Sequence, residues 1–192
     1  MKLKGRLAMA KRGHKLLKDK LEALIQDFVR IVRENKDLRR EIEAEIIKAF
    51  QAQNKASLML SEKDKELITV FPQQKLVVEV GTRHITGVQV PEFEVRIEGD
   101  PYTYSLINTP SEIDQAFGSF FQVLPRIIQL AEAEKTIELL AVEIEKTRRR
   151  VNALEYILIP SLEETIKYIN LKLDELARSS IVGIMRIKGS LK

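Results

Sequence analysis

Apolar residues recur along the first part of the chain in alternating steps of four and three. The series runs Leu3, Leu7, Ala10, His14, Leu17, Leu21, Leu24, Phe28, Ile31, Asn35, Leu38, Ile42, Glu45, Ala49, Ala52, Ala56 and Met59. Only His14, Asn35 and Glu45 place a polar side chain on it. A period of 3.5 sustained for about eight heptads is typical of a coiled coil. No Pro or Gly lies between Gly13 and Phe71, so the pattern predicts one very long helix.

A second helical pattern begins near Ser111 and closes the chain. Its apolar positions keep the 3.5 period from Ile137 to Leu158, and successive steps of four then indicate a stutter that locally unwinds the supercoil. Pro125 and Pro160 interrupt this segment. We expect Pro125 at the first turn of the long helix, where proline is tolerated. Pro160 lies too far inside the helix to be tolerated as a first-turn proline. It is expected to kink the helix, because it removes a backbone hydrogen bond and crowds the preceding turn.

Between the two helical segments the period changes to two. Phe93, Val95 and Ile97 alternate with charged residues, which predicts a half-buried strand. Residues 76–80 predict another strand, and residues 85–90 a third. Two or three short strands are not stable alone in water, so this insert must pack against the helices or a partner. The residues expected to mark its turns are Gly81, Gly87, Pro91 and the sequence Gly99-Asp100-Pro101.

These patterns predict a mainly α fold: a long antiparallel two-helix coiled coil with a small β-hairpin or meander between the helices. Residues 1–70 form the N-terminal long helix, residues 71–110 the β insert and residues 111–192 the C-terminal long helix of one elongated unit. A helix pair of this kind has little core for its length and is typical of a spacer, an arm or a shaft.

The net charge of +4 conceals an uneven distribution. Residues 1–20 carry +7 and residues 176–192 carry +4, which leaves −7 for the segment between them. If the helices pair antiparallel, both basic ends come to the same end of the pair.

Composition narrows the class of protein further. Charged residues make up 31% and aromatic residues 6%, which suits long helices. The chain has no cysteine, so disulfides and thiol chemistry are excluded. No apolar run approaches the roughly 20 residues needed to cross a bilayer, and the N-terminus lacks the apolar core of a signal peptide. We therefore expect a cytoplasmic protein that does not insert into the membrane.

The chain offers little material for an active site. Its two histidines are far apart in sequence: His14 lies on the heptad series, where packing or register is the main expectation, and His84 lies in a Gly-flanked segment expected to be a surface turn. No phosphate loop, metal-ligand set or catalytic triad can be assembled. The Glu-rich stretches are typical of solvated helix faces. We expect no catalytic residues, no metal and no cofactor, and hence no enzyme activity of the chain alone.

Three consecutive arginines, Arg148, Arg149 and Arg150, precede an apolar run and Pro160. Successive helical residues are turned by about 100°, so the three side chains fan around most of the helix. Solubility is the simple interpretation. The alternative is that protein surrounds this part of the coil and presents acidic groups on several sides.

Two blocks at the chain ends resemble a known family. AKRGHKLLKDK (residues 10–20) and EKTRRRVNALEYILIPSLEETIKYI (residues 145–169) are similar to the signature blocks of the D subunit of the V-type and A-type rotary ATPases, and LPRIIQLAEAEKT (residues 124–136) fits the approach to the second block. The match covers both ends of the chain and the β insert only in outline.

This resemblance implies a rotor shaft, or central stalk, that couples ATP hydrolysis or synthesis to H⁺ or Na⁺ transport. The implied partners are the catalytic A and B subunits, the F subunit and the subunit that caps the membrane ring. The protein would be cytoplasmic and peripheral to the membrane. By position in the matched blocks and by charge, the candidate contacts to the A/B hexamer are Lys11, Arg12, Lys15, Arg148, Arg149 and Arg150. Pro160 is the candidate origin of a curved shaft.

Two other classes of function stay open at this point. A basic two-helix arm can bind RNA, although it lacks aromatic residues for stacking and its middle is acidic. A prefoldin-like chaperone arm would need exposed apolar tips and self-assembly through its β part.

Overall fold

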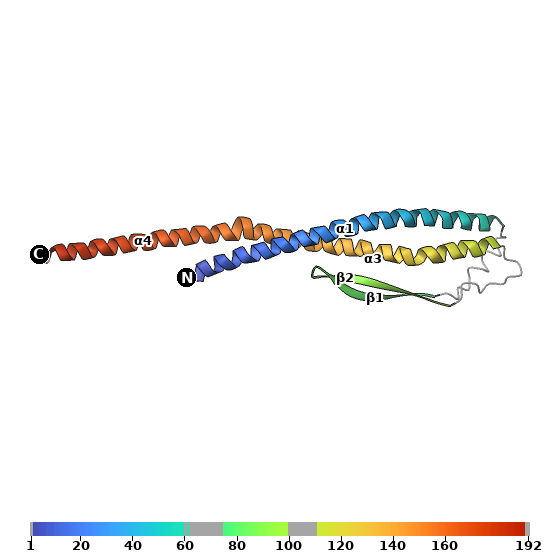
Figure 1. Ribbon diagram of the computed structural model, residues 1–192, viewed down its shortest axis with the longest axis horizontal. Coiled ribbons are helices and arrows are strands. Elements are labelled where there is room, and N and C mark those ends of the chain that lie inside the picture. Colours follow the sequence, from blue (N-terminus) through green and yellow to red (C-terminus); the bar gives the residue numbers. More distant parts are fainter. Residues whose placement is uncertain (1, 60, 62–74, 100–110, 191–192) are drawn as a thin grey trace. The chain divides into compact units, whose positions relative to one another are not determined.

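The computed structural model describes residues 2–59, 61, 75–99 and 111–190 of the chain. Its elements are helix α1 (Lys2–Met59), strands β1 (Lys75–Ile85) and β2 (Val88–Glu98), helix α3 (Ser111–Ala153), the π-helical segment η1 (Leu154–Leu158) and helix α4 (Ile159–Ser190) (Figure 1). The predicted fold class, mainly α with a small antiparallel β insert, is therefore confirmed. The predicted boundary between residues 70 and 71 lies outside the described residues, and that between 110 and 111 adjoins the start of α3.

Internal contacts divide the chain into two units. The terminal unit contains Met1–Ala23 and Ile144–Lys192, and the hairpin unit contains Leu24–Glu143. Each unit includes part of α1, and each is described by itself below.

The predicted apolar seam of α1 is confirmed along almost its whole length. Every member of the 3.5-residue series from Leu3 to Ala56 is buried or half-buried, including the three polar members. The last member, Met59, is exposed. On α3 the buried residues Leu140, Thr147 and Val151 continue the corresponding series. Burial thus follows the heptad pattern, as expected when one stripe of a helix packs against a neighbouring helix.

In the hairpin unit α1 and α3 run antiparallel. Arg39 on α1 lies 3.7 Å from Glu134 on α3, and Phe50 packs edge-on against Phe120 with 5.5 Å between ring centroids. Rising numbers along α1 therefore meet falling numbers along α3. Figure 1 shows the two ribbons side by side in this unit.

Small residues let the two helices approach at the end of α1. Ala56 is buried in a cluster with Ile113 and Ala116 of α3, and Ala52 and Phe117 pack against this cluster. The aromatic ring fills the space that the small side chains leave, which is how dense packing is reached between two helices.

The β insert is one two-stranded antiparallel hairpin, β1 paired with β2. Ile85 pairs with Val88, so Thr86 and Gly87 alone form the turn, and both have positive φ, 48° and 76°. Two central residues with positive φ are characteristic of the type I′ turn that matches the twist of a hairpin. The predicted third strand at residues 85–90 is wrong, because this segment is the turn and the adjoining ends of β1 and β2.

Several predicted turn residues also lie inside the strands. Gly81 and Pro91 belong to β1 and β2, where Pro91 pairs with Thr82. Proline is tolerated there because each strand of a two-stranded sheet is an edge strand. His84 is likewise a strand residue, paired with Gln89, and not part of a turn. Asp100 and Pro101 of the predicted turn at residues 99–101 lie outside the described residues.

The second helical segment begins at Ser111, as predicted, but Pro125 does not lie in its first turn. Pro125 lies inside α3, which continues on both sides of it. The prediction was wrong because it assumed that helix formation could not tolerate the lost amide, whereas packing of residues 113–123 against α1 holds the preceding turns in place.

Candidate interaction surfaces

The predicted arginine collar lies in the terminal unit and is open to solvent. Arg148, Arg149 and Arg150 are all exposed, and the residues on either side of them, Thr147 and Val151, are buried on the seam. The three guanidinium groups thus occupy the sides of the helix that do not face α1. Arg149 donates to Glu145 on the preceding turn at 2.6 Å.

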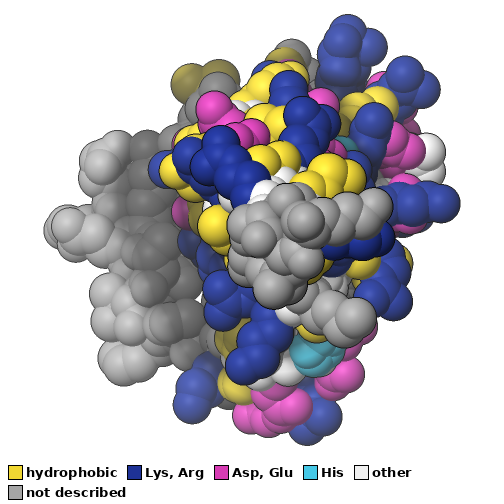
Figure 2. All heavy atoms as spheres, turned by 90° about the vertical axis from the view of Figure 1, so that its left-hand side faces the viewer, with side chains coloured by type: hydrophobic (Ala, Val, Ile, Leu, Met, Phe, Trp, Pro, Cys, Tyr) yellow, Lys and Arg dark blue, Asp and Glu magenta, His cyan; other side chains and the backbone are white. Residues whose placement is uncertain are grey.

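The three predicted basic contacts on α1 are also exposed, but they differ in their surroundings. The ammonium group of Lys11 lies 2.6 Å from Glu163 of α4. Arg12 donates to the backbone oxygen of Ala8, at 3.4 Å. Lys15 is exposed as well. On the face that Figure 2 shows, Lys and Arg side chains gather around smaller apolar areas.

His14 contacts a residue that sequence analysis missed. It is half-buried on the seam, and its Nε2 lies 3.2 Å from Glu155 Oε2 in η1. Because Lys11 and His14 of α1 meet Glu163 and Glu155, the helices of the terminal unit are antiparallel as well. Sequence alone could not identify Glu155 and Glu163 as the acidic partners, because nothing in it distinguishes them from the other Glu residues on a solvated helix face.

A π-helical segment directly precedes Pro160. In η1 the backbone amide of Ile159 donates to the oxygen of Leu154, five residues earlier. A proline crowds the carbonyl four residues before it and has no amide to donate. A wider π turn before the proline relieves that crowding, and such turns are recognised sites of helix distortion. Pro160 as the origin of a curved shaft stays a prediction.

From Tyr168 to Met185 the large apolar residues of α4 are exposed, whereas Leu162 and Ile166, nearer to η1, are half-buried. Ile169, Leu173 and Leu176 continue the spacing of the apolar series after Leu158, but they lie on the surface and not in a buried seam. Lys11 of α1 pairs with Glu163, and all of these exposed residues follow that point in α4. The other large exposed apolar residues of this segment are Tyr168, Leu171, Ile181, Val182, Ile184 and Met185.

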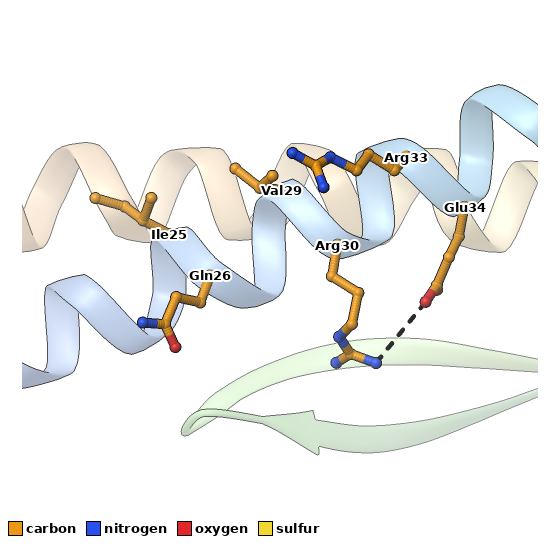
Figure 3. A pocket seen from close by; sticks show the side chains of 6 residues that line it. All are labelled: Ile25, Gln26, Val29, Arg30, Arg33 and Glu34. Atoms are coloured by element: carbon orange, nitrogen blue, oxygen red, sulfur yellow. Dashed lines mark ion pairs between the residues drawn. The ribbon is translucent and has the colours of Figure 1, made fainter.

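A shallow groove runs along α1 in the hairpin unit. Ile25, Val29 and Arg33 line one side of it and point away from the hairpin, whereas Gln26, Arg30 and Glu34 point toward the hairpin (Figure 3). Ile25 and Val29 are exposed. The groove therefore offers an apolar strip with charged residues beside it.

Within the described ranges, no group of three or more His, Asp or Glu side chains is placed to hold a metal ion. In the same residues, no helix combines the length and the apolar character needed to cross a bilayer.

Sequence comparison decides the family. A family model that describes the D subunit of ATP synthase matches residues 1–189. The chain belongs to the ATP synthase D-subunit family. The V-type ATP synthase D subunit of Thermoanaerobacter sp. (strain X514) is 48% identical over 97% of this chain and 90% of its own length.

Two further relatives carry the same name. The V-type ATP synthase D subunit of Acetivibrio thermocellus is 46% identical over 97% of this chain and 86% of its own length. That of Clostridium botulinum (strain ATCC 19397 / Type A) is 43% identical over 100% of this chain and 91% of its own length. As a member of this family, the chain is a component of a V-type ATP synthase. The RNA-binding and chaperone alternatives gain no support from these relatives.

Proposed function

We propose that this chain is the rotating central shaft of its complex. In this role it carries no active site and couples nucleotide turnover in the A and B subunits to H⁺ or Na⁺ transport in the membrane part. It works in the cytoplasm, peripheral to the membrane. The observation that best supports this role is the exposed apolar part of α4, residues 168–185. In an isolated chain, this many large apolar residues exposed to water on one helix would favour aggregation. Partner subunits that enclose the helix would remove this exposure.

The exposed charges of the terminal unit fit a bearing inside a ring of A and B subunits. Arg148, Arg149 and Arg150 are exposed, and as consecutive helical residues they are turned by about 100° from one another, which suits acidic groups on several sides of the helix. Lys11, Arg12 and Lys15 extend the positive surface on α1. Exposed ion pairs are individually weak, so a charged collar can guide a turning shaft without holding it at one angle.

An asymmetric shaft can distinguish catalytic sites that are otherwise equivalent. The shaft favours a different conformation at each site, and the coupling is reciprocal between shaft angle and nucleotide state. The π turn η1 and Pro160 break the regularity of one helix only. We propose that this irregularity supplies part of the required asymmetry.

The F subunit and the subunit that caps the membrane ring complete the set of partners. The family resemblance implies that the F subunit binds the middle of the paired helices. In the hairpin unit, the groove at Ile25 and Val29 is the apolar surface that fits such a contact, and we propose it as the candidate.

Co-expression with the A, B and F subunits of the same organism tests the proposed role. We expect a complex that contains one copy of this chain and hydrolyses ATP at a different rate from the A/B assembly alone. Failure of the chain to join the A, B or F subunits, together with binding to RNA or to itself, would overturn the proposal.

The collar is tested in the same complex with two triple variants. Replacing Arg148, Arg149 and Arg150 with Ala should weaken assembly or alter ATP turnover, and the difference from the wild type should shrink at high salt, which screens the wild-type charges. Replacing the same three residues with Lys keeps the charge and serves as the matched control. Equal behaviour of the Ala and Lys variants at every salt concentration would show that charge at these positions does not act as a bearing.

A further inference from the structure

The turn of the hairpin holds Thr86 in a backbone conformation that is unfavourable for threonine and better suited to other residue types. Thr86 has a φ of 48°, in the left-handed region where β-branched residues are rare. Asn and Gly are the residues usually found at this position of a type I′ turn. An observed backbone strain that persists calls for a compensating contact, and such contacts are often functional.

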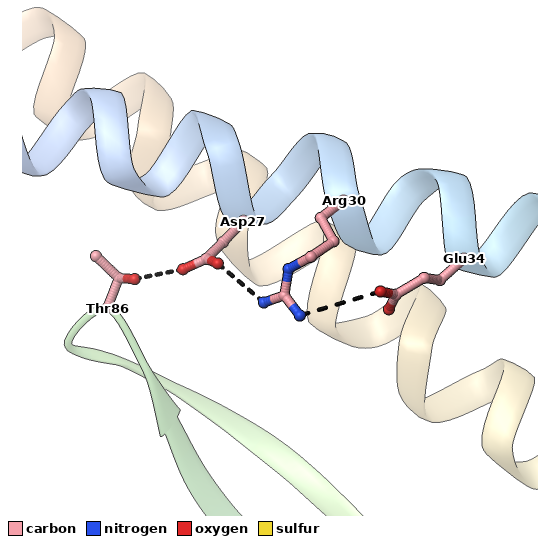
Figure 4. A network of polar contacts seen from close by, with 4 residues as sticks. All are labelled: Asp27, Arg30, Glu34 and Thr86. Carbon is pink, nitrogen blue, oxygen red and sulfur yellow. Dashed lines mark hydrogen bonds and ion pairs between the residues drawn. The ribbon is translucent and has the colours of Figure 1, made fainter.

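The compensating contact is a hydrogen bond to α1. The Thr86 hydroxyl donates to Asp27 Oδ2 at 2.6 Å, and Figure 4 shows the turn reaching this carboxylate. Asp27 also accepts from Arg30 at 2.9 Å, and Arg30 in turn lies 4.0 Å from Glu34. Asn or Gly would remove the strain but would not present a hydroxyl at this point.

The same hairpin contacts α3 through a second acidic residue. The backbone amide of Phe93 in β2 donates to Glu132 Oε2 at 2.9 Å, and Arg83 of β1 lies 3.3 Å from Glu132 Oε1. Glu132 therefore holds both strands, one through the main chain and one through a side chain. Next to the turn, Val90 of β2 is buried, so apolar packing accompanies the polar contacts.

We propose that the hairpin is a clasp that fixes the position of α1 relative to α3, with Thr86 and Glu132 as its positioning residues. Asp27 lies on α1 and Glu132 on α3, and the hairpin is bonded to both. If one helix slid by a single turn, about 5.4 Å, at least one of these contacts would break. This inference concerns the hairpin unit alone and does not depend on the proposed rotation.

The Phe93 amide reports whether the clasp is closed. It bonds to Glu132 and not to the partner strand, so its hydrogen exchange is slow only while the hairpin lies against α3. Alternate amides of a strand point to opposite edges, so the amides of Glu92 and Glu94 face β1 and report the hairpin itself. Comparing these sites separates undocking of the hairpin from its unfolding.

The test is residue-resolved hydrogen exchange on the full chain with Thr86→Gly and Asp27→Ala. The first variant relieves the strained turn and removes the hydroxyl, and the second removes the acceptor without touching the turn. Each should speed exchange of the Phe93 amide about tenfold, the factor expected for one lost hydrogen bond. Exchange at residues 92 and 94 should not become faster in either variant. The double variant should exchange no faster than either single variant, because both remove one interaction.

Glu43→Ala is the matched control for Asp27→Ala, since Glu43 is an acidic residue of α1 that pairs locally with Arg39. It should leave Phe93 exchange as in the wild type. Unchanged Phe93 exchange in both Thr86→Gly and Asp27→Ala would overturn the clasp. Faster exchange at residues 92 and 94 in step with Phe93 would also overturn the clasp. Thr86 and Asp27 would then stabilise the hairpin itself and not its docking against the helices.

Discussion

Two leucines of α1, eight positions apart, make a matched test of the coiled-coil packing. Leu24 lies on the seam and is 0% exposed, whereas Leu16 lies off the seam and is 70% exposed. Both are internal residues of the same helix. Replacing each with Ala therefore makes the same chemical change in two environments.

The expected magnitudes follow from the exposed fractions. Leu→Ala removes three carbon groups, and at about 0.8 kcal/mol for each buried group the loss at Leu24 is about 2.5 kcal/mol. This lies at the lower end of measured Leu→Ala values, as expected for a two-helix core that can partly close on the vacated space. At Leu16 only about a third of that burial is present, so the loss is about 0.7 kcal/mol. The better helix propensity of Ala lowers both losses by roughly 0.2 kcal/mol.

The assay is urea unfolding of the isolated chain, followed by circular dichroism at a helical wavelength. We expect the Leu24→Ala midpoint to fall well below that of Leu16→Ala with an unchanged denaturant slope. Equal destabilisation by the two substitutions, or a larger effect at Leu16, would refute the burial pattern on which the register of α1 rests.

Three further predictions test other contacts. Pro160→Ala should lower the coupling of ATP hydrolysis to ion transport in the assembled complex, measured as ions moved per ATP, and unchanged coupling would show that Pro160 does not shape the shaft. Arg126 of α3 pairs with both Glu41 and Glu45 of α1. Arg126→Ala should therefore lower the free energy of unfolding by about 1–2 kcal/mol at low salt and by less at high salt. An effect that does not depend on salt would contradict the assignment of these contacts as ion pairs. The Thr86 hydroxyl, and after it Arg30, hold the pKa of Asp27 below its ordinary value of 3.8, so the carboxylate stabilises the docked hairpin above about pH 4 and loses this effect as the pH falls through the lowered pKa. The protection of the Phe93 amide, meaning how much more slowly it exchanges than a free amide at the same pH, should therefore fall in acid in the wild type. The same pH profile of protection in Asp27→Asn would exclude Asp27 as its source.

Heptad periodicity predicted most of the helical fold. A buried seam repeats at every turn, so the signal in α1 is averaged over many residues and a few polar members do not hide it. The exposed second half of α4 could not be predicted in the same way. Its apolar spacing continues the series, so the spacing alone gives no sign that these residues are exposed.

The hairpin turn was harder to predict because its residues are atypical. Thr86-Gly87 is not the Asn-Gly pair that usually signals a two-residue hairpin turn. Gly81 and Pro91 are residue types that usually interrupt strands, yet here they lie within them. The tertiary contact between Thr86 and Asp27 lies outside any local pattern, since the two residues are far apart in sequence. The same applies to Glu155 and Glu132, whose roles depend on which helix or strand faces them.

The sequence predicts which surface residues are charged, but it does not predict which groups those residues contact. Sequence places Arg148, Arg149 and Arg150 on the exposed sides of the helix, and their exposure agrees with that placement. What they touch depends on partner subunits. Lys11 illustrates the limit of such a prediction, because its charge is already paired with Glu163 inside the chain.

Observation of rotation tests the central claim most directly. The chain has no cysteine, so Val80→Cys, at an exposed position of β1, provides a single attachment point on this chain for a bead, in a complex whose other subunits have had accessible cysteines replaced. With the A and B subunits fixed to a surface, we predict one-directional rotation driven by ATP. ATP hydrolysis by the same complexes with a bead that only fluctuates about one angle would contradict the role of this chain as the rotating shaft.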